Sequence, residues 1–456
     1  MIKAVQLILS LSFLVVLHEL GHFLAARAFK TRVEKFYMFF DFMFPFPHLL
    51  NFALFKKKIG DTEYGIGWFP MGGYVKIAGM VDESTDLDQL SAEPKPDEFR
   101  SKKNWQKLII MLGGIIMNLI VGWLIYSHLL FWVGEQILPT ENARLGVQCD
   151  SLALKIGFRN GDIILSHDGG KKFESLQSVG KELLLDDVKT VTVNREGSLT
   201  DITIPADFTS MAVNQSKAGK RPLFEFNVPC MVGEIAEKSA IKGIMQPGDV
   251  IINIDSQPIR YFSDARPVLQ ARKSKDVPVA FLRKSDTLHA MVHVMDSGVL
   301  GFFFPSDVKM LKGYVDFTEK HFGFFESLTA GAAKAYGRTI DYIKQFKLIF
   351  SPKVKGYKQL GGVGTMAGLF PDRWDWIAFW SMTAFLSLIL AVANLLPIPM
   401  LDGGYVILLL FEMISGRKLS DATVEKINRV GLVLLLGLMI YANGNDLWRL
   451  VLSKFF

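Results

Sequence analysis

The chain has 456 residues, of which 50% are hydrophobic, and its formal net charge is +6. The mean hydropathy is positive (+0.26), and the apolar residues collect at the two ends, whereas the middle has the mixed composition of a water-soluble domain. This distribution predicts a membrane protein with an extramembrane insert of more than one domain. The basic residues show no long run, which argues against nucleic acid as a partner.

Four stretches are apolar and long enough to cross the hydrocarbon core of a bilayer, which takes ~20 residues of helix. They run from about Ala4 to Phe29, Leu108 to Val133, Trp376 to Leu396 and Val430 to Val451, the last interrupted by a polar patch at Asn443–Asp446. The first stretch is not interpreted as a cleaved leader, because its apolar run continues through a His-Glu-Leu-Gly-His sequence. We therefore predict an α-helical polytopic membrane protein with four spans.

Lysine and arginine near the spans predict their direction. They gather between the first two spans and between the last two: Arg27, Lys30, Arg32, Lys35, Arg100, Lys102, Lys103, Lys107, Arg417, Lys418, Lys426 and Arg429. Both of these loops are expected in the cytoplasm. The amino terminus, the large insert and the carboxy terminus are then expected on the outer side.

The first span carries the sequence His18-Glu19-Leu-Gly-His22, an HExxH pattern. Residues four apart share a helix face, so both imidazoles can reach one metal ion, with Glu19 placed to take a proton from water. Zinc suits two imidazoles and needs at least one further protein ligand. A solvated charged turn is the alternative interpretation, but a glutamate inside an apolar span costs ~2.5–3.5 kcal/mol on insertion scales, so a functional role is favoured.

The end of the third span supplies a candidate third ligand, Asp402, in the sequence Asn394-Leu-Leu-Pro-Ile-Pro-Met-Leu-Asp402-Gly-Gly. Two prolines must break the helix there, and two glycines permit turns that other residues avoid. A broken helix is tolerated at membrane depth where it is buried in protein or lines a wet cavity. The alternative role for Asp402 is to cap a following helix that begins near Tyr405.

These two motifs together resemble the site-2 protease family of intramembrane metalloproteases. The segment Gly65–Ile77 also resembles that family's membrane-dipping β-hairpin. The resemblance implies His18, His22 and Asp402 as ligands of Zn2+, Glu19 as the general base acting on zinc-activated water, and Asn394 as a substrate-binding residue. It further implies that an unwound substrate is held as an added strand by the hairpin, including Gly72, Gly73, Tyr74 and Val75. The chain departs from the family at Ile115 and Val363, where proline is usual.

The middle of the chain alternates short strand patterns with turn signals and contains an internal repeat. Gly161-Asp-Ile-Ile-Leu-Ser-His-Asp168 recurs as Gly248-Asp-Val-Ile-Ile-Asn-Ile-Asp255, an offset of 87 residues, which predicts two tandem domains. They resemble the PDZ domains of bacterial envelope proteases, which bind peptides by strand addition. Folded bulk that excludes substrates with large outer domains is an equally weighted alternative. The two cysteines, Cys149 and Cys230, either pair or stay separate partly buried thiols.

The expected organisation follows from these segments. It comprises span 1 with HExxH (1–30), a cytoplasmic loop with the membrane-dipping hairpin (31–107), span 2 (108–134), two PDZ-like β-rich (α+β) domains (135–220 and 221–308), an amphipathic helix with a glycine-rich linker (309–374), span 3 with the aspartate motif (375–411) and span 4 (412–456).

The function predicted is that of an intramembrane zinc metalloendopeptidase. The tandem domains resemble those of bacterial envelope-stress members of the family. That resemblance implies the bacterial inner membrane, a periplasmic insert, and single-span substrates such as an anti-sigma factor or signal-peptide remnants. A membrane scaffold that binds partners through its PDZ-like domains is the alternative, and it would not require Glu19 or Asp402.

Overall fold

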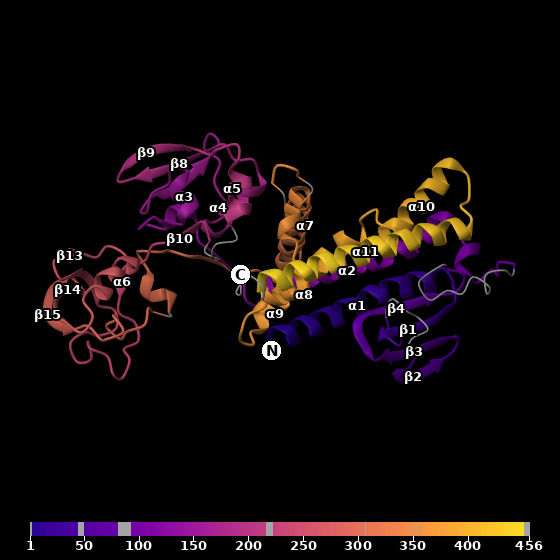
Figure 1. Cartoon of the computed structure of the whole chain (residues 1–456), viewed down its shortest axis with the longest axis horizontal. Coiled ribbons are helices and arrows are strands. Elements are labelled where there is room, and N and C mark those ends of the chain that lie inside the picture. Colours follow the sequence, from indigo (N-terminus) through magenta and orange to yellow (C-terminus); the bar gives the residue numbers. More distant parts are fainter. Residues whose placement is uncertain are drawn as a thin grey trace. The chain divides into compact units, whose positions relative to one another are not determined.

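The computed structural model of the chain describes residues 2–43, 50–80, 93–215, 222–305, 307–349, 351–354 and 356–450. It divides into two compact units, one of residues 1–134, 321–351 and 355–456, and one of residues 135–320 and 352–354. Four helices in the described part are long and apolar enough to cross a membrane, and all belong to the first unit. The predicted fold class, four spans with a β-rich insert, is confirmed (Figure 1).

The helices of the first unit have the following bounds. The candidate spans are α1 (Ile2–Ala28), α2 (Asn104–Trp132), α9 (Trp376–Asn394) and α11 (Asp421–Leu450), and the other helices are α7 (Phe324–Ile349), α8 (Val363–Gly368) and α10 (Asp402–Ser415), with short 3-10 turns η2 (Phe99–Ser101) and η6 (Gly356–Gln359). The helix of the fourth span begins nine residues before the expected start at Val430. The expected end at Val451 lies outside the described residues.

Helix α2 lies at the centre of this unit and packs against α1, α7 and α9. Glycines let its backbone approach two of these neighbours: a Cβ at Gly21 would lie 2.2 Å from the carbonyl oxygen of Gly113, and a Cβ at Gly331 would lie 2.1 Å from Ser127 Oγ. Small residues at helix crossings favour such close packing within a membrane, where helices gain little from hydrophobic burial. The HExxH sequence on α1 is therefore held directly against the backbone of α2.

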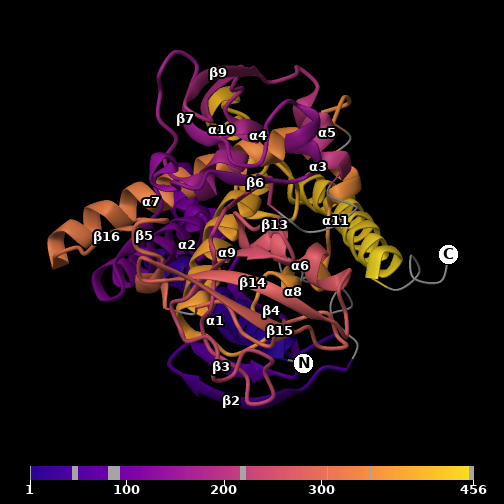
Figure 2. The same ribbon diagram turned by 90° about the vertical axis from the view of Figure 1, so that its left-hand side faces the viewer.

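The loop between α1 and α2 forms a four-stranded sheet in the order β2-β3-β1-β4. Its strands are β1 (Val33–Phe40), β2 (Ala53–Ile59), β3 (Thr62–Gly67) and β4 (Phe69–Ile77). The hairpin predicted over residues 65–77 is not present, because β1 lies between β3 and β4, parallel to the first and antiparallel to the second. The motif instead ends on β4, which is an edge strand of the sheet in the described structure. Figure 1 labels the four strands, and Figure 2 shows the same region from a second side.

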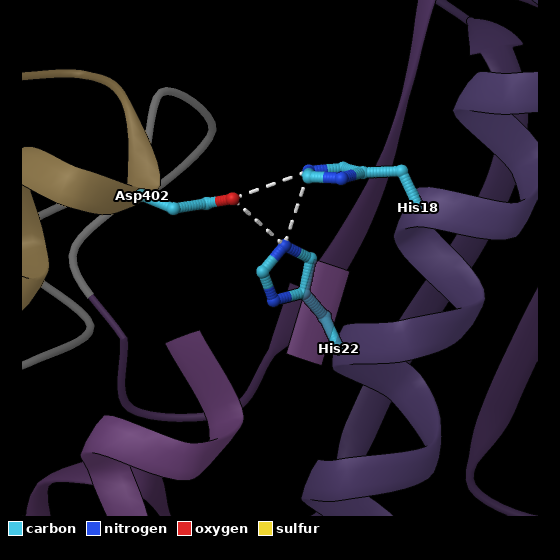
Figure 3. A group of neighbouring side chains, drawn as sticks. All are labelled: His18, His22 and Asp402. Atoms are coloured by element: carbon cyan, nitrogen blue, oxygen red, sulfur yellow. Dashed lines mark hydrogen bonds and ion pairs between the residues drawn. The ribbon is translucent and has the colours of Figure 1, made fainter. Parts of the chain in front are cut away.

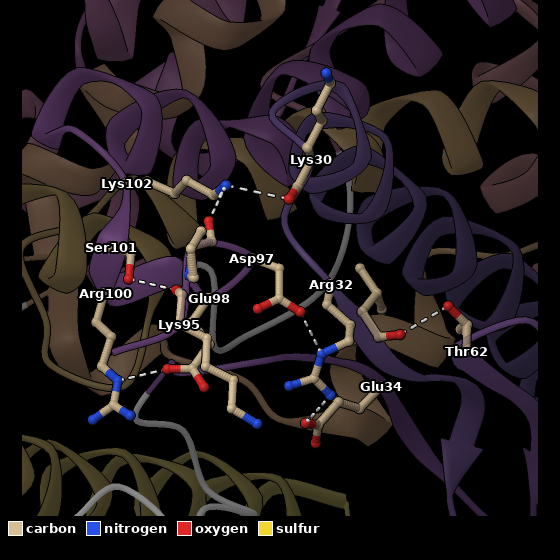
Figure 4. A network of polar contacts seen from close by, with 12 residues as sticks. Lys30, Arg32, Glu34, Thr62, Lys95, Asp97, Glu98, Arg100, Ser101 and Lys102 are labelled. Atoms are coloured by element: carbon tan, nitrogen blue, oxygen red, sulfur yellow. Dashed lines mark hydrogen bonds and ion pairs between the residues drawn. The ribbon is translucent and has the colours of Figure 1, made fainter. Parts of the chain in front are cut away.

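A polar network joins this sheet to the entry of α2 (Figure 4). Arg32 donates to Asp97 through Nε at 2.9 Å and to Glu34 through Nη1 at 2.9 Å. The ammonium group of Lys102 donates to the backbone carbonyls of Lys30 (3.2 Å) and Pro96 (2.8 Å). These contacts fix the direction in which the chain leaves the sheet and enters α2.

The polar patch within α11 has a structural explanation. The Asp446 carboxylate accepts hydrogen bonds from the backbone N–H groups of Gly362 (2.9 Å) and Thr365 (2.8 Å), and Asn443 Oδ1 accepts from Val363 N–H at 3.2 Å. These N–H groups belong to the first turn of α8, which has no intrahelical acceptor for them. Asp446, which is 5% exposed, therefore caps the start of α8 although it belongs to α11.

The second unit holds the inserted strands and short helices. Its elements are β5 (Glu135–Ile137), η3 (Thr140–Asn142), β6 (Val147–Cys149), α3 (Ser151–Lys155), β7 (Ile163–His167), η4 (Leu176–Ser178), α4 (Val179–Leu185), β8 (Thr190–Arg195), β9 (Ser198–Thr203), α5 (Phe208–Gln215), β10 (Phe224–Phe226), β11 (Cys230–Met231), β12 (Val250–Ile254), β13 (Gln257–Pro258), α6 (Phe262–Gln270), β14 (Asp276–Arg283), β15 (Asp286–His293), η5 (Val308–Leu311) and β16 (Thr318–Lys320).

The internal repeat of the sequence is a repeat of structure. Strands β7 and β12 are offset by 87 residues at both ends. Each copy buries the aspartate of its Gly-Asp pair under an arginine: Arg195 donates to both oxygens of Asp162, and Arg283 donates to both oxygens of Asp249. The two copies also have separate hydrophobic cores.

The cysteines lie in different cores, Cys149 in the first and Cys230 in the second, and both are free and buried. Burial raises the pKa of each thiol to about 12. Protonated, buried thiols are unreactive, so the structure favours the reading of two separate thiols over a disulfide.

Candidate metal centre

Three side chains converge between α1 and the start of α10. The Nε2 atoms of His18 and His22 are 3.3 Å apart, and Asp402 Oδ2 lies 3.2 Å from the first and 3.3 Å from the second (Figure 3). The two histidines are one helical turn apart, whereas Asp402 comes from the other end of the sequence. Within the described residues, this is the one group of histidine, cysteine and acidic side chains with metal-binding geometry.

A tight turn after α9 brings Asp402 to the histidines. Met400 within it adopts a left-handed backbone conformation (φ 78°), which is unfavourable for a residue with a side chain. Asp402 is the first residue of α10, and Leu401 occupies the N-cap position, so Asp402 is not the cap that the alternative interpretation required. Its carboxylate still lies at the positive end of the helix dipole.

The two glycines after Asp402 serve close packing and not a turn. Both are helical, and a Cβ at Gly403 would lie 2.4 Å from the carbonyl of Leu395, while one at Gly404 would lie 2.4 Å from the carbonyl of Ile398. The first turn of α10 therefore crosses the end of α9 with no room for side chains. The sequence prediction that these glycines permit special turns is corrected accordingly.

The donor set fits zinc. The Nδ1 atom of His22 lies 2.8 Å from the backbone carbonyl oxygen of Ile110, so Nδ1 carries the ring proton and the lone pair of Nε2 faces Asp402. Asp402 Oδ2 is buried and has no hydrogen-bond partner in the described structure. Tetrahedral zinc with bonds of ~2.0–2.1 Å separates its ligand atoms by roughly 3.3 Å, which matches the three distances observed.

Helix α2 packs against the rings of His18 and His22. A Cβ at Gly114 would lie 2.4 Å from His22 Nε2 and 2.5 Å from His18 Cε1. Glycine is therefore required at this position for both rings to keep the positions observed. The isoleucine at 115, where proline is usual in the family that the sequence resembles, lies in an unbroken helix and leaves this contact intact.

The third residue of the motif, Glu19, borders a cavity of about 180 Å³ that also reaches both histidines and Asp402. Its carboxylate interacts with the backbone N–H of Val75 on β4. Gly73 and Tyr74 line the same cavity, and Gly72 is next to them on β4. The strand that the sequence predicted to hold substrate therefore borders the metal centre.

Asn394, the last residue of α9, also reaches the site. Its Nδ2 lies 3.2 Å from His18 Nε2. Asn428 of α11 lines the cavity and was not predicted from the sequence, because a single asparagine near the start of a span carries no pattern. Asn118 of α2 was also not predicted, although a polar residue in the middle of an apolar span was a signal that could have found it, and its Nδ2 lies 3.2 Å from His18 Nδ1.

A second polar cluster holds the wall of the cavity in place. The hydroxyl of Tyr74 donates to Asp41 at 2.9 Å, and Lys35 pairs with the same carboxylate at 3.2 Å. The Tyr37 ring stacks on Tyr74 and its hydroxyl donates to Glu63 at 2.7 Å. Burial and the Asp41 carboxylate raise the pKa of Tyr74, so this side chain stays a neutral hydrogen-bond donor.

A helix-borne HExxH motif, a third ligand from a second helix and an adjacent glutamate define a zinc metallopeptidase site built on membrane helices. The comparisons with known proteins agree. The model of peptidase family M50 matches residues 6–438, and the chain belongs to this family.

Several relatives are similar over nearly their whole length. The chain is 26% identical over 455 residues to the putative zinc metalloprotease Cj1068 of Campylobacter jejuni, covering 99% of this chain and 94% of the relative. It is 26% identical over 469 residues to the regulator of sigma-E protease RseP of Escherichia coli (97% and 98%), and 25% identical over 468 residues to the metalloprotease MmpA of Caulobacter vibrioides (100% and 98%). The predictions of a multi-pass membrane zinc metalloprotease and of protein substrates are confirmed.

Proposed function

We propose that the enzyme cleaves single-span transmembrane proteins inside or at the edge of the bilayer. The observation that carries this proposal is the position of the metal centre. His18, Glu19 and His22 lie within α1, which is long and apolar enough to cross a membrane. A peptide bond must therefore reach the depth of this helix to be cut. A membrane-anchored peptidase of soluble peptides would instead carry the motif outside its spans.

His18, His22 and Asp402 would hold the metal, each through the atom that faces the other two. When bound, zinc supplies a Lewis acid that polarises the scissile carbonyl and lowers the pKa of water. The Glu19 carboxylate takes the proton of the attacking water and returns it to the leaving amine, as a general base and then a general acid. The interaction of Glu19 with the N–H of Val75 holds the carboxylate beside the cavity during both steps.

Asn394 is placed to bind the substrate carbonyl. Its Nδ2 faces His18 Nε2, the atom that would bind the metal. If His18 Nε2 holds the metal, it would no longer accept this hydrogen bond, and the Asn394 N–H would be available to donate to the scissile carbonyl or to the developing oxyanion. Removal of one such donor costs ~10²–10³ in kcat in other hydrolases.

The β4 edge is suited to present an unwound substrate. Only one side of β4 is paired within the sheet, with β1. Alternate residues of an antiparallel strand direct both backbone polar groups to the same edge, and the Val75 N–H faces Glu19, so Gly73 shares that open edge. A substrate strand added there would pair its backbone groups at membrane depth, where no water satisfies them. Tyr74, between Gly73 and Val75, lines the cavity, and Gly72 precedes them on the same strand.

We further propose that the enzyme lies in the inner membrane of a bacterium with the insert in the periplasm. The repeated domains would bind peptide or protein ligands in the manner of PDZ domains, or screen substrates by size. The relative from Escherichia coli is named a regulator of sigma-E protease. We propose an anti-sigma factor or signal-peptide remnants as substrates, because each can meet the requirement for a single span.

Cleavage of a model single-span substrate by purified protein in detergent tests the proposal. Wild type, Glu19→Gln and Asp402→Asn are compared, each with its bound zinc counted, and a soluble peptide with the same cleavage sequence serves as the second substrate. We expect only the wild type to be active. It should cut the membrane substrate in preference to the soluble peptide. Glu19→Gln should retain zinc, and Asp402→Asn should lose it.

Two outcomes would contradict the proposal. Equal cleavage of the soluble peptide would show that membrane depth is not part of substrate selection. Absence of cleavage and of zinc in all three proteins would favour the scaffold that binds partners through its PDZ-like domains.

A further inference from the structure

Asn118 is a buried polar side chain that the mechanism above does not use. It lies in the middle of α2, at 0% exposure, in a helix that is otherwise mostly apolar there. A polar group at such depth is costly unless it is paired and is functional in most membrane proteins. Its position is fixed, because its backbone carbonyl accepts a hydrogen bond from Ser387 Oγ of α9 at 2.7 Å.

The side chain of Asn118 points at the first histidine of the metal centre. Its amide nitrogen lies 3.2 Å from His18 Nδ1, and its amide oxygen is buried with no hydrogen-bond partner in the described structure. The nitrogen and oxygen of an amide occupy nearly the same shape, so a rotation by 180° exchanges them. After this rotation the unpartnered oxygen is the atom that faces His18 Nδ1.

Metal binding decides which orientation of the amide is favourable. A neutral imidazole that offers the lone pair of Nε2 carries its proton on Nδ1, and this N–H requires an acceptor. The amide oxygen of Asn118 is that acceptor. His22 has the same arrangement, since its Nδ1 lies 2.8 Å from the carbonyl oxygen of Ile110, also on α2. Ile110 and Asn118 are eight residues apart, about two helical turns, and therefore share one face of α2.

We propose that Asn118 is a positioning residue of the metal centre. Its amide oxygen accepts the Nδ1 proton of His18 and holds the ring with Nε2 directed at Asp402 and His22. Helix α2 then orients both imidazoles without contributing a metal ligand. This inference rests on the proposed role of His18 as a zinc ligand. Hydrogen-bond partners of ligating histidines typically contribute 10–100-fold to metal affinity.

Zinc affinity of the purified full-length protein, measured in detergent by competition with a chelator, tests the proposal. Asn118→Leu removes the acceptor at similar size, and Asn118→Asp keeps an acceptor at the same place. Ser127→Ala is the matched control, because Ser127 is a buried polar residue of α2 that donates within its own helix. His18→Ala reports on the ligand itself. Thermal unfolding of each metal-free protein measures any effect on folding alone.

We expect Asn118→Leu to bind zinc 10–100-fold more weakly than wild type, Asn118→Asp to restore most of the affinity, and Ser127→Ala to match wild type. The metal-free Asn118→Leu protein should unfold at the wild-type temperature or above, because it no longer buries an unpartnered polar atom.

Wild-type affinity in Asn118→Leu, with zinc lost in His18→Ala, would overturn this inference and leave the proposed function intact. Equal loss of zinc in Asn118→Leu and Asn118→Asp, with a lower unfolding temperature of both metal-free proteins, would assign Asn118 to packing and also overturn it. Unchanged zinc in His18→Ala would overturn the ligand assignment from which both proposals start.

Discussion

Gly114→Ala is expected to abolish zinc binding without unfolding the protein. The added Cβ would lie 2.4 Å from His22 Nε2, 2.5 Å from His18 Cε1 and 2.7 Å from His18 Nδ1, whereas ordinary contacts begin at 3.4 Å. The His22 ring would have to move by the difference, 3.4 − 2.4 = 1.0 Å. Metal-ligand distances tolerate only about 0.2 Å. The affinity for zinc should therefore fall by more than the ~100-fold that loss of a hydrogen-bond partner costs.

The effect of this variant on stability combines two opposing contributions. Alanine is favoured over glycine in a helix interior by about 1 kcal/mol, which offsets part of the ~1–3 kcal/mol that overpacking costs, so the metal-free variant should remain folded and lose at most about 2 kcal/mol of unfolding free energy. Chelator competition measures the zinc affinity, and thermal unfolding of the metal-free protein measures the stability. Gly122→Ala on the same helix is the control, since its Cβ would meet the side chain of Leu388, at 2.7 Å, and the backbone carbonyl oxygen of Ala384, at 3.3 Å, and neither residue belongs to the metal centre. Wild-type zinc affinity in Gly114→Ala would refute the reasoning, because the two rings could then move aside without cost.

Three further predictions concern the capping of α8 by Asp446 and the inserted domains. Asp446→Asn should lower the free energy of unfolding by about 1.5–3 kcal/mol through weaker charge-assisted hydrogen bonds, measured by thermal unfolding in detergent with the exposed Asp372→Asn as control. Hydrogen bonds from the backbone at residues 189 and 190 lower the pKa of Asp168 from 3.8 to about 2, so Asp168 stabilises the insert above about pH 4 and this contribution fades as the pH falls towards 2. The protection of the insert from hydrogen exchange, measured as a function of pH, should show this loss of stability. In Asp168→Asn this pH dependence should be absent. Cys149 and Cys230, with pKa values of about 12, should react with a maleimide at pH 8 only after unfolding, and rapid labelling of the folded protein would contradict their burial.

The candidate metal ligands could be predicted from the sequence because their signals are local. His18 and His22 lie one turn apart in an apolar span, and Asp402 follows two prolines that no continuous helix accommodates. The zinc site follows from these patterns alone. The duplicated domains could also be predicted from the sequence, because the Gly-Asp motif repeats at a fixed offset. In the structure each copy uses its aspartate in the same buried ion pair.

The supporting residues could not be predicted in this way. Gly114 matters because of what α1 places against it, and nothing in its own sequence neighbourhood distinguishes it from a packing residue; Asn118 is conspicuous as a polar residue in an apolar span, but its partner on α1 is not visible in the sequence. The sheet was predicted as a hairpin because β3 and β4 are consecutive, whereas the insertion of β1 between them depends on long-range pairing. The capping role of Asp446 could not be predicted for the same reason, because its partners at the start of α8 lie about 80 residues away in the sequence.

The separation of the ligands along the chain has a consequence during synthesis. Asp402 is translated 402 − 22 = 380 residues after His22. At 5–20 residues per second the ribosome needs roughly 20–75 s to cover that interval. The HExxH helix thus enters the membrane early but lacks its third ligand until both repeated domains and the third span have been made. A nascent chain that has not yet reached α10, or one truncated before it, therefore contains His18, Glu19 and His22 but no complete candidate metal centre.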